Sequence, residues 1–215
     1  PPGQYRTTRE LVVRNNTKIF GAGNSWNPTP STDSWIQYDG PESPDLAVLR
    51  VSTTPIGVEP RSALTNIHIE KIVLNGGDRA GYGLYSVYCS DDSTFSDVTV
   101  RHCTEHGIFI SQQWYSTYRN LVARNNSGCG ITIGRIFENW RPLGVNGVQF
   151  SNIRAARNGS DRAFHEQSRR DWGYGVLFCP GGGTSLHNVV SERNYGAGLI
   201  YDLGRSCSNR VDGAY

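Results

Sequence analysis

The stretch Phe95-Ser96-Asp97-Val98-Thr99-Val100 contains a pattern that the chain repeats. The pattern has six positions: a large apolar residue, any residue, Asn or Asp, an aliphatic residue, any residue, and a small or aliphatic residue. Regular repetition of a short unit is typical of solenoid proteins, which stack one coil on the next. The other clear copies are Leu64–Ile69, Tyr118–Ala123, Phe150–Ala155 and Leu186–Ser191, and a degraded copy begins at Cys207.

A glycine and a short apolar strand follow each clear copy. These glycines are Gly83, Gly107, Gly130, Gly175 and Gly198, at intervals of 24, 23, 45 and 23 residues. Three intervals fit one short coil, and the long one holds two insertions, near 136–146 and 159–173. Two alternating strands per coil, joined by Gly and Asn turns, predict a parallel β-solenoid. A β-sandwich is the alternative, but it would leave the near-constant spacing to chance.

Asparagines recur at one corner of the predicted coils. Asn125-Asn126, Asn158 and Asn194 occupy this corner, and Cys103 shares it. Gly and Asn accept left-handed backbone conformations that other residues resist. Stacked Asn side chains can also bond to one another along the stack, so we expect an asparagine ladder here.

The composition fits a turn-rich β protein and excludes several partners. The 215 residues include 25 Gly, and the net charge is +2 with 19% charged residues. This balance gives no reason to expect nucleic acid, and no apolar run is long enough for membrane insertion. The five Cys form no Cys-x-x-Cys pair and are interpreted as buried apolar residues. Asp91-Asp92 is interpreted as a turn rather than a calcium site, so no metal and no cofactor are predicted.

The opening of the chain carries a second pattern. Pro2-Gly3-Gln4-Tyr5 is followed by Lys18-Ile19-Phe20-Gly21-Ala22-Gly23 and then by Trp35-Ile36-Gln37-Tyr38. This order resembles the first coils of pectate-lyase-like right-handed β-helices, a superfamily of phage tailspikes, polysaccharide lyases, glycosidases and uronan epimerases. The resemblance implies one all-β domain over residues 1–215, a right-handed single-stranded parallel β-helix of about eight coils. Residues 1–60 would form irregular first coils and residues 61–215 regular ones.

The start of the chain departs from the family pattern. An amphipathic helix normally precedes the first strand and covers that end of the β-helix, whereas this chain begins inside the strand. Uncovered solenoid ends expose unpaired strand edges and aggregate. We therefore expect the chain to be a segment of a longer one, or its ends to be covered by neighbouring subunits.

Strand alternation predicts an outward row of apolar residues. If Ile108 and Ile110 point inward, then Phe109, Leu177 and Ile200 point outward on successive coils. A monomer does not usually expose such a row. We interpret these three residues as a subunit interface, as in trimeric tailspikes, and a sugar-binding groove is the alternative.

Aromatic and arginine residues are concentrated in the two insertions. Flat aromatic faces stack on sugar rings, and arginine pairs bidentately with carboxylates. Insertions in a solenoid often form its binding face, although here they could instead pack against a neighbouring subunit. The predicted carbohydrate-binding residues are Trp114, Trp140, Arg141, Arg169, Arg170 and Trp172.

The catalytic prediction rests on carboxylates near these loops. Glycoside hydrolysis uses two carboxyl groups, about 5–5.5 Å or about 6.5–9.5 Å apart, and coils stack about 4.8 Å apart. No two candidates share a register, so the sequence identifies no pair. A lyase or epimerase would instead need a base and a cation, for which His102, His106, His165, Arg101 and Arg169 are available. The carboxylate candidates are Glu138, Asp161, Glu166, Asp171 and Asp202.

Three functions remain open at this point. The sequence most resembles the shaft of a phage tailspike or tail fibre, in a virion, that binds a bacterial surface polysaccharide for host recognition and could depolymerise it. A homotrimer within a larger assembly would fit this function. A secreted, monomeric polysaccharide lyase, glycosidase or epimerase is the second function, and a non-catalytic adhesive β-helix is the third.

Overall fold

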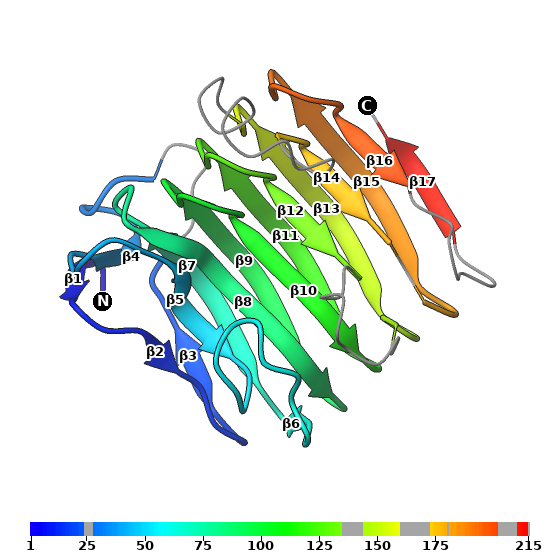
Figure 1. Cartoon of the computed structure of the whole chain (residues 1–215), viewed down its shortest axis with the longest axis horizontal. Helices are drawn as coiled ribbons and strands as arrows, with labels where there is room; N and C mark the ends of the chain where they lie inside the picture. The colour runs from blue at the N-terminus through cyan, green and yellow to red at the C-terminus, as the bar shows by residue number, and fades with distance from the viewer. Residues whose placement is uncertain (24–27, 135–143, 160–172, 180, 202–209, 215) are drawn as a thin grey trace.

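A computed structural model describes residues 1–23, 28–134, 144–159, 173–179, 181–201 and 210–214. In these ranges the regular elements are β-strands, stacked side by side along the long axis of the molecule (Figure 1). All strand pairs are parallel, and the strands form two sheets. None of the described residues forms a helix capable of crossing a bilayer.

The first sheet, sheet A, follows the order β1-β4-β7-β9-β11-β13-β15-β17, with β3 also paired to β7. These eight successive levels agree with the prediction of about eight coils. Its strands are β1 (Gly3–Thr7), β3 (Lys18–Phe20), β4 (Ser34–Tyr38), β7 (His68–Asn75), β9 (Thr94–Arg101), β11 (Thr117–Arg124), β13 (Gln149–Ala156), β15 (Ser185–Glu192) and β17 (Arg210–Ala214).

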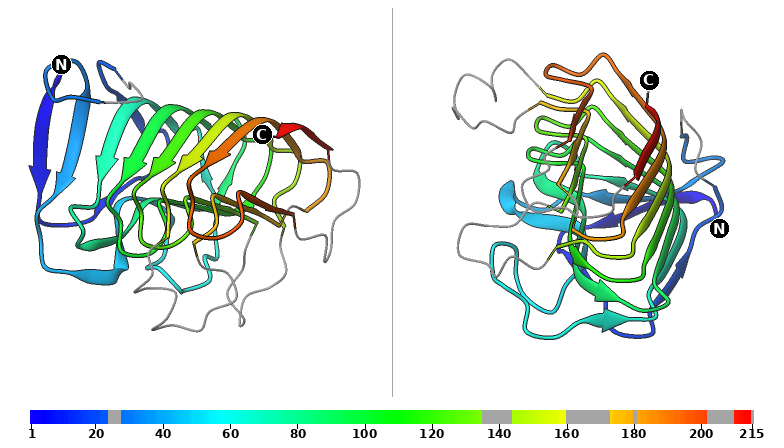
Figure 2. Two further views of the ribbon diagram at one scale, coloured as in Figure 1. Left: turned by 90° about the horizontal axis from the view of Figure 1, so that it is seen from above. Right: turned by 90° about the vertical axis from the view of Figure 1, so that its right-hand side faces the viewer.

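The second sheet, sheet B, follows the order β16-β14-β12-β10-β8-β5-β2, with β6 paired to β8. From β7 onward the chain alternates between the two sheets, and the coils nest around a common centre when seen along the axis (Figure 2). This is the predicted all-β, right-handed parallel β-helix. The strands of sheet B are β2 (Leu11–Val12), β5 (Ser43–Val51), β6 (Leu64–Thr65), β8 (Ala80–Ser90), β10 (Ile108–Gln113), β12 (Ile131–Ile133), β14 (Val176–Phe178) and β16 (Leu199–Tyr201).

The glycine spacing correctly predicts the register of sheet B. The residues that follow the five glycines, Leu84, Ile108, Ile131, Val176 and Leu199, are direct neighbours on successive strands. The 45-residue interval adds no coil, because β12 pairs directly with β14. Its extra residues lie between β12 and β13 and between β13 and β14.

The predicted position of the first copy of the repeat, Leu64–Ile69, is wrong. Phe95 pairs with Ile69, not with Leu64, which instead pairs with Cys89 of sheet B. The true copy is therefore Ile69–Leu74, with Lys71 at the position that Asn or Asp occupies in the later coils. Lys71 adopts the same left-handed conformation as those residues, with φ of 56°.

A left-handed residue bends each regular strand of sheet A at the Asn or Asp position. Asp97, Asn120, Asn152 and Asn188 have φ between 53° and 55°. Their side chains also join the coils: each asparagine Nδ2 donates to the Oδ1 of the preceding coil, at 2.8 to 2.9 Å. The regular position of Asn or Asp in the repeat thus has a backbone cause, since these two residues tolerate the left-handed conformation better than most others that carry a side chain.

The predicted asparagine ladder is confirmed at the next corner. Asn126 Nδ2 donates to Asn158 Oδ1 and Asn158 Nδ2 to Asn194 Oδ1, both at 2.9 Å. Asn126 Oδ1 in turn accepts the backbone N–H of Cys103, at 3.1 Å. Asn126 and Asn158 are buried, so these bonds satisfy polar groups inside the turn.

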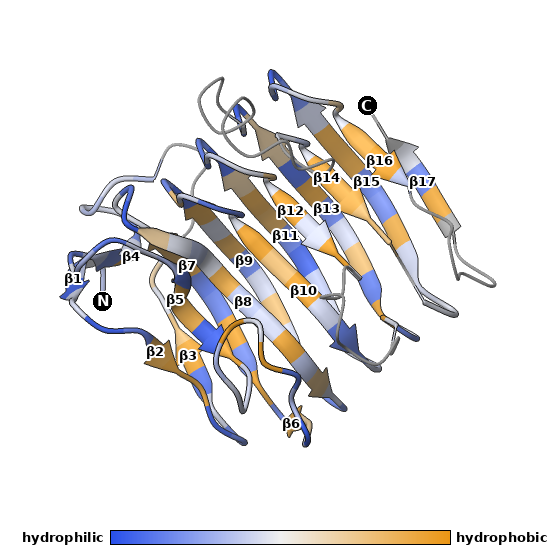
Figure 3. Ribbon diagram, in the orientation of Figure 1, coloured by the Kyte–Doolittle hydropathy of each residue, from blue (hydrophilic) through white to orange (hydrophobic). Residues whose placement is uncertain are grey.

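The core lies between the sheets. Apolar and polar residues alternate along the strands (Figure 3), and the inward side chains form one continuous cluster. Aromatic rings stack between coils: Phe95 on Tyr118 at 4.5 Å and Tyr118 on Phe150 at 5.1 Å between ring centroids. The buried Tyr118 hydroxyl bonds to Ser86 and donates to Gln113, both at 3.0 Å.

Candidate functional site

The outer face of sheet B carries the outward row that the sequence predicts. Register aligns Tyr85, Phe109, Thr132, Leu177 and Ile200 on successive strands. Tyr85 and Phe109 belong to a hydrophobic cluster separate from the core, so they point to the outside of the β-helix, as predicted. The row is not an exposed stripe, however: Phe109 is 3% and Leu177 2% exposed, and Ile200 is half-buried. Their role as a subunit interface stays a prediction.

Residues 52–63, which connect β5 to β6, explain part of this burial. Ile56 from this loop packs on the outer cluster. Beneath it, the Tyr85 and Phe109 rings stack at 5.2 Å with 8° between their planes, and Tyr82 meets both edge-on. Burial raises the pKa of the Tyr85 phenol. The sequence repeats give no sign of this loop, because it interrupts a single early coil.

Arg50 holds the loop to the sheet. Its Nε donates to Glu10 Oε2 at 2.6 Å, and both side chains are largely buried. The Arg50 guanidinium also donates to the backbone carbonyls of Ser52 and Thr54, at the start of the loop. One guanidinium therefore joins β5, the first coil and the loop.

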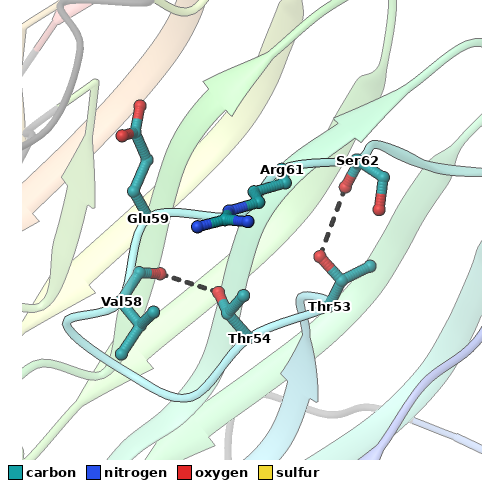
Figure 4. A pocket seen from close by; sticks show the side chains of 6 residues that line it. All are labelled: Thr53, Thr54, Val58, Glu59, Arg61 and Ser62. Atoms are coloured by element: carbon teal, nitrogen blue, oxygen red, sulfur yellow. Dashed lines mark hydrogen bonds between the residues drawn. The ribbon is translucent and has the colours of Figure 1, made fainter.

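The two limbs of the loop border an open hollow of about 1000 Å³ (Figure 4). Thr54 Oγ1 donates to the Val58 carbonyl at 2.7 Å, and Thr53 Oγ1 to the Ser62 carbonyl at 3.3 Å. Glu59 and Arg61 also line the hollow, so both signs of charge are present at its rim. Hydroxyl, carboxylate and guanidinium groups are the types that bind sugar hydroxyls.

His106 lies at the other end of the aromatic cluster. Its ring is 5.8 Å from Tyr82 and 6.4 Å from Phe109. The Cys129 backbone N–H points at His106 Nδ1, at 3.1 Å. Nδ1 therefore accepts this hydrogen bond, and in the neutral ring the proton is on Nε2.

On strands β10 and β12, the outward hydroxyl groups Ser111 Oγ and Thr132 Oγ1 are buried without a hydrogen-bond partner. A buried hydroxyl without a partner costs about 1–3 kcal/mol. Such groups are found where a site binds a polar ligand or stores strain. They mark the outer face of β10 and β12 as the polar part of the candidate site.

Of the predicted carbohydrate-binding residues and carboxylate candidates, Trp114 alone lies within the described residues. It is half-buried after the end of β10, and its ring is 5.1 Å from that of Tyr88. It lies at the far end of β10 from His106, and it is joined to the outer cluster through Tyr88, which packs against that cluster. Those outside the described residues are Glu138, Trp140, Arg141, Asp161, Glu166, Asp171, Arg169, Arg170, Trp172, His165 and Asp202.

The described residues contain no group of His, Cys, Asp and Glu arranged to hold a metal ion. Asp91 and Asp92 adopt left-handed conformations in the exposed connection between β8 and β9, as expected of a turn. Cys89 and Cys103 are buried free thiols, and Cys129 is also buried. Burial raises the pKa of Cys89 to about 11 and also raises that of Cys103, so these thiols are not nucleophiles at neutral pH.

Comparison with solved structures identifies proteins of similar architecture. The A-module of mannuronan C-5 epimerase AlgE4 from Azotobacter vinelandii matches 99% of the chain with a TM-score of 0.61 and 17% identity. ORF18 of Geobacillus virus E2 matches 99% with a TM-score of 0.53 and 15% identity. The chain has a right-handed parallel β-helix fold.

The same comparison finds pectate lyase Pel9A, over 97% of the chain, at 17% identity and a TM-score of 0.47. The chain spans 54%, 51% and 60% of the three solved chains, which is roughly half of each. No protein-family model matches the sequence, and neither does any curated protein. At these identities the likeness concerns the fold, and the site has to be argued from the residues of this chain.

Proposed function

We propose that this β-helix binds a bacterial surface polysaccharide on the outer face of sheet B, as part of a phage tailspike or tail fibre. The observation that carries the proposal is that the two insertions connect to adjacent strands of sheet B. The chain leaves β12 into the first and enters β14 from the second, and β12 and β14 are adjacent strands. The tryptophans and arginines of both insertions thus belong to segments that join opposite ends of two adjacent strands of sheet B.

Polar and aromatic groups near these strands suit a sugar ligand. Thr132 on β12 contributes a buried hydroxyl, and the His106 and Tyr82 rings lie two coils or fewer away. Aromatic rings and hydroxyls together are typical of carbohydrate sites. The fold likeness to a viral protein supports the phage assignment.

Trp140→Ala and Trp172→Ala test the location of the site. Each is expected to weaken binding of the host polysaccharide at least tenfold, because one lost stacking surface is worth about 1–3 kcal/mol by analogy with aromatic stacking on bases. Binding is measured by titration calorimetry. The control is Tyr5→Ala, which removes an exposed aromatic side chain from the first strand of sheet A and should bind as the wild type does. Unchanged binding in both insertion variants would contradict the placement.

A secreted polysaccharide lyase or epimerase is the second candidate, favoured by the fold likeness to the epimerase A-module. Product analysis separates the candidates. A lyase produces unsaturated, ultraviolet-absorbing ends, a glycosidase shortens the polymer without them, and an epimerase changes sugar configuration at constant length. A binding protein leaves the polymer unchanged.

A further inference from the structure

A tyrosine occupies a turn position that the next two coils give to glycine. The register of β11, β13 and β15 aligns Tyr115, Gly147 and Gly183 in the turns that precede these strands. All three residues have a left-handed backbone, with φ of 51°, 63° and 62°. Glycine adopts this conformation without steric cost, whereas a bulky side chain is strained in it. Tyr115 is therefore not the residue that the fold favours at this position.

The Tyr115 ring is held against the next coil and is open to solvent. A Cβ atom added to Gly147 would lie 2.9 Å from Tyr115 Cδ1 and 3.0 Å from Cε1, so the ring fills the space that this glycine leaves. Tyr115 is nevertheless 70% exposed, the largest value among the exposed large hydrophobic residues that the structure describes. Strained residues are concentrated at functional sites such as ligand clamps. A strained and exposed aromatic residue is therefore a candidate for ligand contact.

Two further aromatic residues lie at the same end of sheet B. Tyr88 and Trp114 are half-buried, and their ring centroids are 5.1 Å apart with 59° between the planes. Tyr88 also has a left-handed backbone, with φ of 59°, and packs against the outer cluster of sheet B. We name Tyr88, Trp114 and Tyr115 the aromatic corner. Two of its three members are thus held in conformations that bulky residues resist.

The charge beside the aromatic corner is negative. The register of β8 and β10 aligns Asp91 with Tyr115, and both Asp91 and Asp92 are exposed. Their carboxylates can accept hydrogen bonds from hydroxyl groups but repel anions. No lysine or arginine occurs in the described turns of the four coils concerned, 90–93, 114–116, 146–148 and 181–184.

We propose that the aromatic corner binds a neutral sugar unit, which stacks a C–H face on Tyr115 and donates hydroxyl hydrogen bonds to Asp91 or Asp92. A flat aromatic ring held by its neighbours offers such a face at little cost in conformational entropy. A nucleotide fits less well, because its phosphate meets the same two carboxylates. The choice of a sugar rests on the proposed function, but the corner lies at a turn, beyond the end of β10, and selects for lack of charge.

The test compares the wild type with Tyr115→Gly on an array of neutral gluco-, galacto- and manno-oligosaccharides and their uronate counterparts. The wild type should bind at least one neutral oligosaccharide, and bind its uronate counterpart more weakly. Tyr115→Gly should bind that neutral oligosaccharide about tenfold more weakly, which corresponds to about 1.4 kcal/mol. Asp92→Asn should reduce the preference for the neutral sugar, because it removes one of the repelling charges.

Stability separates a ligand contact from a structural role. Tyr115→Gly places at this turn the residue that the next two coils use, so its free energy of unfolding in urea should equal or exceed that of the wild type. Phe20→Ala is the matched control for binding, since Phe20 is a 63% exposed aromatic residue on sheet A. It should bind the oligosaccharides as the wild type does.

Four results would overturn the proposal: no neutral oligosaccharide bound by the wild type, tighter binding of the uronates, equal binding by Tyr115→Gly, or equal weakening in Phe20→Ala. A lower free energy of unfolding in Tyr115→Gly would also overturn it, by assigning the ring a structural role. Failure here is distinguishable from failure of the proposed function. If Trp140→Ala and Trp172→Ala weaken polysaccharide binding and Tyr115→Gly does not, the sheet B site stands without the aromatic corner.

Discussion

At the scale of single residues, Asn158 links three coils from inside a turn. Its Nδ2 donates to the Ala123 carbonyl at 3.1 Å and to Asn194 Oδ1 at 2.9 Å, and its Oδ1 accepts from Asn126 Nδ2. Asn158→Ala removes these bonds and leaves buried groups of two neighbours unsatisfied. We expect the free energy of unfolding to fall by about 3 kcal/mol, measured by urea denaturation.

Asn152→Gly is the matched control for this prediction. Asn152 lies on β13, in the same coil as Asn158, and belongs to the exposed asparagine ladder. Its Nδ2 donates to Asn120 Oδ1 at 2.9 Å. Glycine keeps its left-handed conformation, with φ of 55°, without steric cost. The free energy of unfolding of Asn152→Gly should fall by about 1 kcal/mol or less, since water replaces the exposed hydrogen bonds. Equal losses in the two variants would contradict the role given to burial.

The misplaced first repeat also has a cause at this scale. Asn66 and Lys71 both have positive φ, 55° and 56°, but only Asn66 has the side chain that usually reveals such a position. The sequence pattern therefore selects Asn66, five residues too early. The later copies are predicted correctly because asparagine or aspartate occupies each bend, at 97, 120, 152 and 188.

At the scale of elements, Arg50 determines the position of the loop 52–63. Arg50→Ala breaks the largely buried pair with Glu10 and the bonds to the Ser52 and Thr54 carbonyls. A buried charge without its partner costs about 3–5 kcal/mol, and we expect about 2 kcal/mol here because Glu10 is 19% exposed. The released loop should be cut by trypsin after Arg61 before the rest of the chain.

Arg6→Ala is the comparison for this prediction. Arg6 pairs with Asp39 at 3.4 Å, but its side chain is 71% exposed, and surface pairs contribute about 0–1 kcal/mol. This variant should unfold and resist trypsin as the wild type does. If Arg50→Ala resists trypsin equally well, the apolar contact of Ile56 alone suffices to hold the loop.

The limits of sequence reasoning are plain for the outer face of sheet B. Alternation along β10 and β14 gives the outward direction of Phe109 and Leu177 correctly, because strand side chains alternate strictly. It cannot say whether another segment covers them. Covering depends on where a non-repeating loop such as 52–63 folds, and that is decided by contacts between distant residues such as Arg50 and Glu10.

At the scale of the whole molecule, the oligomeric state follows from what the outward row leaves uncovered. Phe109 and Leu177 are already buried, and Ile200, on the last strand of sheet B, is half-buried. If the chain forms the predicted homotrimer, the contact has to involve this end of the row. Sedimentation equilibrium should then give three times the chain mass of 23.8 kDa.

Ile200→Gln should shift this trimer to the monomer, since a polar amide in an apolar contact loses burial energy and is left unsatisfied. Val190→Gln is the matched control, because Val190 is also half-buried and lies in the same coil but on sheet A. It should remain trimeric. A monomeric wild type at micromolar concentration would contradict the interface, and Ile200 would then extend the sugar-binding face of sheet B towards the last coil.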